Sequence, residues 1–295
     1  MLTPRPVGRA MLGRVSVHSI LPGVLTRAAS AAFEAAGIRH IAHGTGNAVQ
    51  AASAAAADPH AHAVVGPYRS ADVAEAVEAT APAGLALLAP VATWAGVTRH
   101  DEPGCDDPAR DCRTVLRLVA RDTEVAARIA GAVLAAGERA LVVAGEHDYG
   151  RQLDGQLRLA SLPRADHAED TDLVVVAGLA GEPEMERAAS SAPLPVVAFD
   201  GAQGAALGER EVRVALPYAP VDGVPTDELL AGVECARRAA HLVIRALAEG
   251  ATDRAEMLIA LRRLGGFDAH GDPTDPPVWL WRADAAWKLR PDRPL

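Results

Sequence analysis

The chain has 295 residues, of which 49% are hydrophobic and 23% charged, so it is long enough for about two domains with apolar cores. Its formal net charge of −9 and its aromatic content of 3% argue against nucleic acid as a partner, because such a partner requires a basic face or a stacking surface. No run of about 18 apolar residues is present, so the sequence predicts no membrane span.

Short apolar segments alternate with alanine-rich segments of helical periodicity along most of the chain. Most of the apolar segments lack the alternating pattern of a half-exposed strand, and this is typical of strands covered on both faces. The pattern therefore predicts an α/β fold with parallel sheets. The predicted strands are 14–17, 39–42, 63–66, 85–89, 140–144, 172–177, 195–199 and 212–216; the predicted helices are 25–36, 47–57, 71–81, 123–136, 150–157, 183–191, 227–249 and 254–264.

The end of the chain predicts a β-hairpin in the segment PPVWLWRADAAWKLRP. Trp279 and Trp281 are two residues apart and so share one face of a strand, and residues 282–285 form the expected turn. Three polar stretches, 117–122, 217–226 and 267–277, interrupt the pattern and are interpreted as crossings between two lobes.

Polar side chains follow several of the predicted strands. In doubly wound sheets, ligands bind beyond the carboxyl ends of the strands, at helix N-termini. Ser70, expected at the N-cap of its helix, and Thr93 offer hydroxyl and N–H donors suited to a carboxylate. Asp200 offers a carboxylate suited to an ammonium group, and Tyr149 offers a phenol. Taken singly, Ser70 could simply cap its helix and Asp200 could simply turn the chain.

Eight segments carry a family likeness when they are taken together and in order. They are VVGPYRS, LLAPVAT, CRTVLRLVARD, AGEHDYGRQL, LVVVAGLAGEPE, VVAFDGAQG, VALPYAP and LGGFDAHGDPTDPPVWLW. This order resembles the type 1 periplasmic binding proteins, and more narrowly the branched-chain amino-acid (Leu/Ile/Val) binding branch of ABC-transporter substrate-binding proteins. The resemblance runs from about residue 13 to 281. It implies two Rossmann-like lobes with parallel sheets, joined by a three-segment hinge, that close on a small ligand.

The resemblance also implies roles for individual residues. Ser70, Thr93 and the main chain of Val91 would bind the carboxylate of an amino acid, Asp200 would bind its ammonium group, and Tyr149 is the tyrosine of the family's "YG" pair. Three features depart from the family: the segment after strand 14–17 is short, residues 157–172 are too few for the usual additional strand and helix, and Leu179 stands where an aromatic residue is usual. Tyr68 and Trp94 flank the implied site.

The expected lobes are residues 13–118 with 227–264, and residues 119–218 with 267–295. The hinge crossings are expected near 117–122, 217–226 and 265–277. The function expected from this arrangement is non-catalytic binding of a small amino acid or a related carboxylate or amide, without cofactor or metal, for uptake by an ABC-transporter permease.

Two alternatives keep the same fold: a cytosolic ligand sensor acting through a regulatory partner protein, and a trimmed family member that binds nothing. The protein is extracytoplasmic if an export signal was removed, and cytoplasmic if Met1 is the native start.

A nucleotide-dependent Rossmann enzyme is a remoter alternative. The segment HGTGNAV at 43–49 follows a predicted strand and opens a helix, as a dinucleotide-binding loop does. However, Val49 replaces the third glycine, and no acidic residue follows about 20 residues later.

Three cysteines are present. Cys105 and Cys112 lie in a polar loop at a spacing that permits a disulfide in an oxidising compartment, while two exposed reduced thiols are the alternative. Cys235 lies in a helical apolar pattern and is interpreted as a core residue. No CxxC motif or tight Cys/His cluster indicates zinc.

Overall fold

The computed structural model describes residues 15–98, 113–191, 193–202, 205, 212–220, 228–284 and 289–295. The chain divides into two compact units. Unit 1 comprises Met1–Val119 and Leu229–Pro276, and unit 2 comprises Ala120–Glu228 and Pro277–Leu295. The chain therefore passes from one unit to the other three times.

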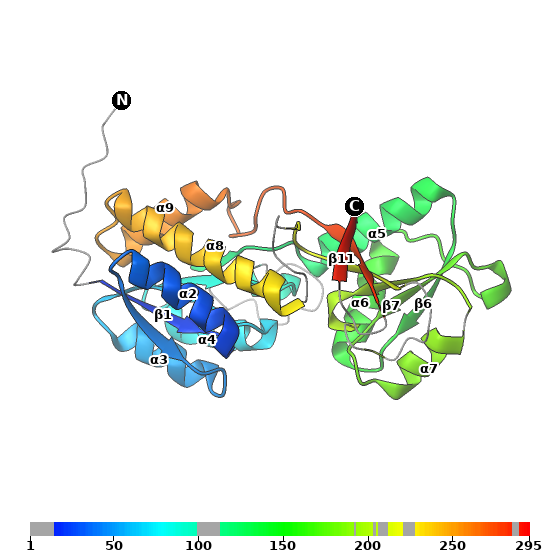
Figure 1. Ribbon diagram of the computed structural model, residues 1–295, viewed down its shortest axis with the longest axis horizontal. Coiled ribbons are helices and arrows are strands. Elements are labelled where there is room, and N and C mark those ends of the chain that lie inside the picture. Colours follow the sequence, from blue (N-terminus) through cyan, green and yellow to red (C-terminus); the bar gives the residue numbers. More distant parts are fainter. Residues whose placement is uncertain are drawn as a thin grey trace, which may run out of the picture. The chain divides into compact units, whose positions relative to one another are not determined.

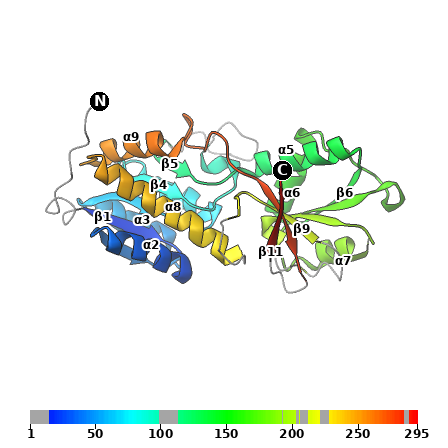
Figure 2. The same ribbon diagram turned by 45° about the horizontal axis from the view of Figure 1, so that its top comes forward.

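Unit 1 is a parallel sheet with helices on both faces. The strand order is β2-β1-β3-β4-β5, and every neighbouring pair is parallel. Helices α2, α8 and α9 pack on one face and α3 and α4 on the other, and Figures 1 and 2 both show α8 running alongside α2. The strands are β1 (Ser16–Ile20), β2 (Arg39–His43), β3 (Ala61–Val65), β4 (Ala86–Ala89) and β5 (Val115–Arg117); the helices are α2 (Gly23–Ala35), α3 (Ala48–Ala57), α4 (Ser70–Thr80), α8 (Glu228–Ala248) and α9 (Arg254–Gly265).

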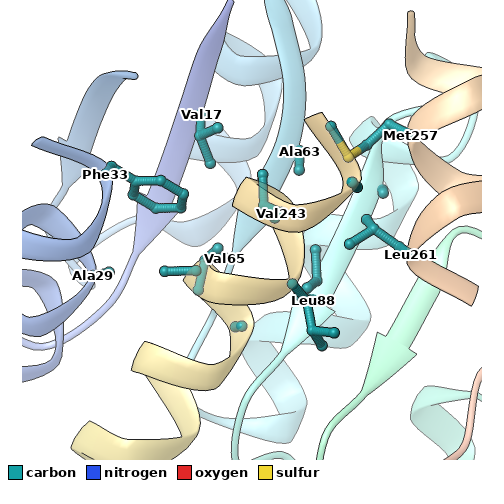
Figure 3. Close-up of a cluster of buried hydrophobic side chains, with 14 of the residues drawn as sticks. Val17, Ala29, Phe33, Ala63, Val65, Leu88, Val243, Met257 and Leu261 are labelled. Carbon is teal, nitrogen blue, oxygen red and sulfur yellow. The ribbon is translucent and has the colours of Figure 1, made fainter. Parts of the chain in front are cut away.

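The core of unit 1 joins residues that are far apart in the sequence. Figure 3 shows Val17, Phe33, Leu88, Val243 and Met257 packed together, from β1, α2, β4, α8 and α9. All five are essentially inaccessible to solvent. Burying each such side chain stabilises the fold by about 1.5–3 kcal/mol. The returning helices α8 and α9 are therefore part of this unit and not an appendage to it.

Strand β1 carries buried polar side chains within the core. Ser16 Oγ donates a hydrogen bond to Asp58 Oδ2 at 2.7 Å, and His18 lies 3.1 Å from the same oxygen and 2.9 Å from His43. These bonds satisfy groups that would otherwise be costly to bury. The strand runs from Ser16 to Ile20, whereas the sequence analysis placed it at 14–17. Its polar residues had hidden it from the search for apolar segments.

Unit 2 is a mixed sheet in the order β11-β10-β9-β8-β7-β6. Strands β6 to β9 are parallel, and β10 and β11 form an antiparallel hairpin at the edge, which Figure 2 shows in red. Helices α5 and α6 cover one face, and α7 packs on the other. The strands are β6 (Ala140–Ala144), β7 (Leu173–Ala177), β8 (Val196–Phe199), β9 (Val212–Leu216), β10 (Trp279–Ala283) and β11 (Leu289–Pro294); the helices are α5 (Asp122–Ala136), α6 (Asp148–Leu159) and α7 (Pro183–Ser191).

The predicted hairpin is present, but its first strand is longer than expected. Arg282 and Ala283, assigned to the turn, belong to β10, and the loop residues 285–288 lie outside the described part of the chain. Trp279 and Trp281 pack against the same core cluster, which confirms that they share one face of the strand. The outer strand β11 contains Pro291 and Pro294.

Two boundaries differ from the sequence analysis. Residues 115–117 form strand β5, which the sequence analysis did not predict. Its last residue, Arg117, had been assigned to the crossing at 117–122. Residues 267–276 belong to unit 1 and not to the second lobe, because Gly271 and Asp272 bond to Arg117 of β5. Among the described helices, none is long and apolar enough to cross a membrane.

Candidate functional site

The polar residues selected in unit 1 lie beyond the carboxyl ends of β3 and β4. Helix α4 begins at Ser70, and the N-cap is Arg69, whose side chain makes no capping bond. Ser70 is therefore the first helical residue and not the cap, a difference of one position from the prediction. Its hydroxyl oxygen accepts a hydrogen bond from the backbone N–H of Trp94 at 3.3 Å. This bond links the start of α4 to the segment that follows β4.

The segment after β4 carries Val91 and Thr93. Val91 is partly buried, and Thr93 is 6% exposed. The N–H of Trp94 occupies one lone pair of Ser70, so the hydroxyl proton of Ser70 remains able to donate. The first N–H groups of α4 lie beside it, and these groups favour an anion. This end of unit 1 can therefore bind a carboxylate with neutral donors.

Arg117 is a residue that the sequence analysis missed. It is completely buried, and it donates hydrogen bonds to the carbonyl oxygens of Ala92 at 2.7 Å and Trp94 at 2.8 Å. It therefore fixes the backbone on both sides of Thr93. The available signal was an arginine inside the apolar run VLRLVA, because a buried charge requires a partner.

In unit 2, Tyr149 and Asp200 are brought together from positions 51 residues apart. Tyr149 lies in the first turn of α6, and Asp200 directly follows β8. The phenol of Tyr149 donates a hydrogen bond to Asp200 Oδ1 at 3.0 Å and lies 3.5 Å from Asp122 Oδ1. Asp122 is 1% exposed and was not selected from the sequence. Two carboxyl groups thus converge on one phenolic hydroxyl.

Burial raises the pKa of Asp200, and hydrogen bonds from Tyr149 and the N–H of Gly201 oppose that rise. The Gly201 N–H donates to Oδ1 at 2.9 Å. Among the residues that the structure describes, no lysine or arginine forms an ion pair with this carboxylate. A carboxyl group in this state gains from a cation more than an exposed one does, because there is less water to screen the attraction.

Leu179 completes the group in unit 2. It follows β7 and is 40% exposed. A Cβ atom at Gly201 would lie 2.7 Å from the Tyr149 ring and 3.0 Å from Leu179 Cδ2, so only glycine permits both neighbours to approach this closely. Tyr149, Leu179 and Asp200 therefore form one cluster beyond the carboxyl ends of β6, β7 and β8.

Glu182 supports this cluster and was also missed. Its carboxylate accepts hydrogen bonds from the N–H of Glu146 at 3.0 Å and the N–H of Leu179 at 2.8 Å. It therefore ties the loop after β6 to the loop after β7. A glutamate just before Pro183, the first residue of α7, is a helix-start signal that the sequence does carry.

The remaining predicted residues play smaller parts. Tyr68 lies between β3 and α4 and packs against the core of unit 1. Cys235 is buried in α8, whereas Cys105 and Cys112 lie outside the described residues, so their pairing stays a prediction. Within the described ranges, no group of three or more His, Cys, Asp or Glu side chains is suited to a metal ion.

The fold defined by these two units is that of the type 1 periplasmic binding proteins, as expected from the sequence. No protein-family model matches the sequence, and no curated protein matches it. Solved structures do match along nearly the whole chain.

Several of the matching structures are substrate-binding proteins of ABC transporters for branched-chain amino acids. One is a substrate-binding protein from Desulfitobacterium hafniense in complex with Leu, with 18% identity and a TM-score of 0.72 over 94% of this chain and 99% of that chain. A leucine-binding protein from Thermotoga maritima has 17% identity and a TM-score of 0.71 over 95% and 98%. A solute-binding protein from R. palustris in complex with 4-hydroxybenzoate has 10% identity and a TM-score of 0.67 over 95% and 96%. At these identities the likeness shows the fold.

Proposed function

We propose that this chain is a non-catalytic solute-binding protein for a small amino acid or a related carboxylate or amide. In this proposal Ser70, Thr93 and the backbone of Val91 bind the carboxylate, and Asp200 with Tyr149 binds the ammonium group. Tyr68 and Leu179 contact the rest of the ligand.

The observation that carries the proposal is the complementary chemistry of the two units. Each unit gathers its selected residues at the carboxyl edge of its own parallel strands, where ligands of such sheets bind. Unit 1 offers neutral donors there, and unit 2 offers a partly buried carboxylate that has no cationic partner in the described chain. Three of the matching structures are complexes with leucine, isoleucine and 4-hydroxybenzoate, each of which carries a carboxylate.

The ammonium contact should dominate the affinity. An ion pair at about 4 Å is worth roughly 4 kcal/mol at an effective dielectric near 20, less the cost of desolvation. Each donor contact to the carboxylate is worth about 1.5–3 kcal/mol. Loss of Asp200 should therefore weaken amino-acid binding more than loss of Ser70.

The test is titration calorimetry with a panel of amino acids, amides and small carboxylates, preceded by a thermal-shift screen. A ligand at 100 times its Kd stabilises the protein by about 2.7 kcal/mol, which such a screen detects. We expect Asp200→Asn to weaken amino-acid binding at least 100-fold. The matched control is Asp148→Asn, because Asp148 lies in the same unit but is fully exposed. This variant should bind the ligand with the affinity of the wild type. An unchanged Kd in Asp200→Asn would refute the assignment.

Delivery of the ligand to an ABC-type permease is the second part of the proposal. It is supported by the matching structures, several of which are substrate-binding proteins of transporters. Uptake of the radiolabelled ligand in cells with and without the gene tests it. Equal uptake in both, with binding intact, would favour the sensor alternative.

A further inference from the structure

Arg117 is a charged residue between two buried hydrophobic residues, Leu116 and Leu118. It is the last residue of β5 and is completely buried. A buried guanidinium must have its donors satisfied, because it cannot exchange its partners for water. The partners of Arg117 come from two segments of unit 1 that lie far apart in the sequence.

The first segment is the one proposed to contact the ligand. The side chain of Arg117 donates to the carbonyl oxygens of Ala92 at 2.7 Å and Trp94 at 2.8 Å, and to Thr98 Oγ1 at 2.9 Å. Only residues Ala95–Val97 of this stretch are helical. The remaining backbone has irregular geometry, and the rigid fork of the guanidinium holds it.

The second segment is the loop that precedes the last crossing into unit 2. Asp272 is 1% exposed, and its Oδ1 accepts hydrogen bonds from Arg117 Nε at 3.0 Å and from Thr98 Oγ1 at 2.6 Å. The backbone N–H of Arg117 also donates to the carbonyl oxygen of Gly271 at 2.8 Å. One buried ion pair thus joins the segment 92–98 to the loop 268–272.

The loop 268–272 is itself tightly built. Asp268 Oδ1 accepts hydrogen bonds from the N–H groups of His270 at 2.9 Å and Asp272 at 3.0 Å. Gly271 has a φ of +94°, and a Cβ there would lie 2.0 Å from the carbonyl oxygen of Val115. The loop therefore lies directly on β5 and has little freedom to shift alone.

Two of the three chain crossings start close to this ion pair. The chain leaves unit 1 after Val119, shortly after Arg117, and again after Pro276, shortly after Asp272. We propose that Arg117 is a positioning residue that couples the ligand-contacting segment 91–94 to these two crossings. The ligand contact in this statement rests on the proposed function, whereas the coupling between the segments rests on the contacts of Arg117.

The coupling follows from the burial of the guanidinium. If the segment 91–94 shifts when a carboxylate binds to it, the carbonyl oxygens of Ala92 and Trp94 move relative to Arg117. The Arg117 side chain then either moves with these oxygens and shifts Asp272 as well, or stays in place and loses hydrogen bonds to its buried guanidinium. The first response costs less, so the loop 268–272 should change together with the segment 91–94.

The test compares Arg117→Lys with Arg254→Lys. Arg254 is a suitable control because it also lies in unit 1, is partly buried and binds several backbone carbonyl oxygens, those of Ala61, Ala83, Ala56 and Asp58. Hydrogen exchange is measured by mass spectrometry on the full chain without ligand, and binding of L-leucine is then measured by calorimetry. Asp272→Asn provides a milder second variant in case Arg117→Lys does not fold.

We expect Arg117→Lys to speed exchange at least tenfold in both 91–98 and 267–276, and to weaken leucine binding at least tenfold. Arg254→Lys should leave both segments and the leucine affinity at wild-type values. Faster exchange in only one of the two segments, or the same change in both variants, would overturn the coupling. If the wild type does not bind leucine, the proposed ligand fails for that probe, while the exchange data still decide the coupling.

Discussion

The two units treat charge in opposite ways at the carboxyl edges of their sheets. In unit 1, the buried charges of Arg117 and Asp272 neutralise each other, and the groups left for a ligand are neutral donors. In unit 2, the partly buried carboxylate of Asp200 is bonded to a phenol and a backbone N–H, neither of which carries a positive charge. At this edge the buried charges of unit 1 are therefore paired, whereas the charge of Asp200 in unit 2 is not neutralised.

This difference has a physical cost and a use. A buried ion pair with well-placed hydrogen bonds keeps its geometry without a ligand, so unit 1 is organised in advance. A partly buried carboxyl group with a raised pKa is poorly stabilised as an anion, so unit 2 gives up stability at neutral pH. A cationic group on a ligand would offset that loss, and the three predictions below test this contrast.

The largest effect is expected at Gly271, which presses the loop 268–272 against β5. We expect Gly271→Ala to destabilise unit 1 by about 2–4 kcal/mol, because the φ of +94° disfavours alanine and the added Cβ would collide with a backbone oxygen. Urea denaturation of the full chain measures the change.

The matched control for Gly271 lies in unit 2. Gly137 ends α5 with a φ of +69°, but a Cβ there would meet no atom within 4 Å. Gly137→Ala should therefore cost only about 1 kcal/mol, from the backbone conformation alone. Equal losses in the two variants would show that the loop 268–272 is not tightly packed on β5.

The second effect is a pH dependence of opposite sign in the two units. Burial lowers the pKa of His18, His40 and His43 in unit 1, although Asp58 partly opposes this at His18 and Glu34 at His40. Below about pH 6.5 the unfolded chain therefore binds more protons than unit 1 does, so the stability of unit 1 falls as the pH falls. A pKa that is one unit lower in the folded protein than in the unfolded chain changes the free energy of unfolding by about 1.4 kcal/mol.

In unit 2, Asp200 acts in the other direction, since its folded pKa is raised and acidification relieves the cost of its charge. Hydrogen exchange of each unit between pH 7.5 and 5.0 measures both trends. The range stays above the acid region in which Asp58 titrates, because bonds from Ser16, His60 and His18 hold its pKa well below the usual range, against the effect of burial. If the stability of unit 2 fell on acidification as that of unit 1 does, the predicted difference between the units would be wrong.

The smallest effect concerns Asp200 itself. We expect Asp200→Asn to stabilise unit 2 by about 0.5–1.5 kcal/mol at pH 7, because the amide removes the partly buried charge and its oxygen can still accept from Tyr149 and Gly201. Thermal unfolding measures the change. The gain should shrink as the pH falls, because protonation of the native carboxyl group removes the same charge. A variant that is destabilised at pH 7 would contradict this prediction.

The sequence predicted the fold well, because its apolar segments and helical periods are local signals. Seven of the eight predicted strands before the hairpin coincide closely with β2 to β4 and β6 to β9. The first was displaced because β1 buries serine and histidine side chains whose partners, such as Asp58, come from another element. A hydrophobic pattern does not identify a polar residue as buried, because its burial depends on a partner from another element.

The same reasoning explains what was missed near the candidate site. Strand β5 has only three residues, and one of them is Arg117, whose partner Asp272 lies 155 residues further along the chain. Junction chemistry did select Tyr149 and Asp200, which the structure joins. The supporting residues Asp122 and Glu182 were not selected, because their roles depend on which loops lie side by side.

The hairpin at the end of the chain limits how the sheet of unit 2 can meet other molecules. Its outer strand, β11, has prolines at 291 and 294, which have no N–H group to donate, and three charged side chains among its six residues. Such a strand is a poor template for a strand from a second chain. The sheet therefore ends at β11 by virtue of its sequence, which protects the protein against edge-to-edge aggregation on this side even when it is concentrated.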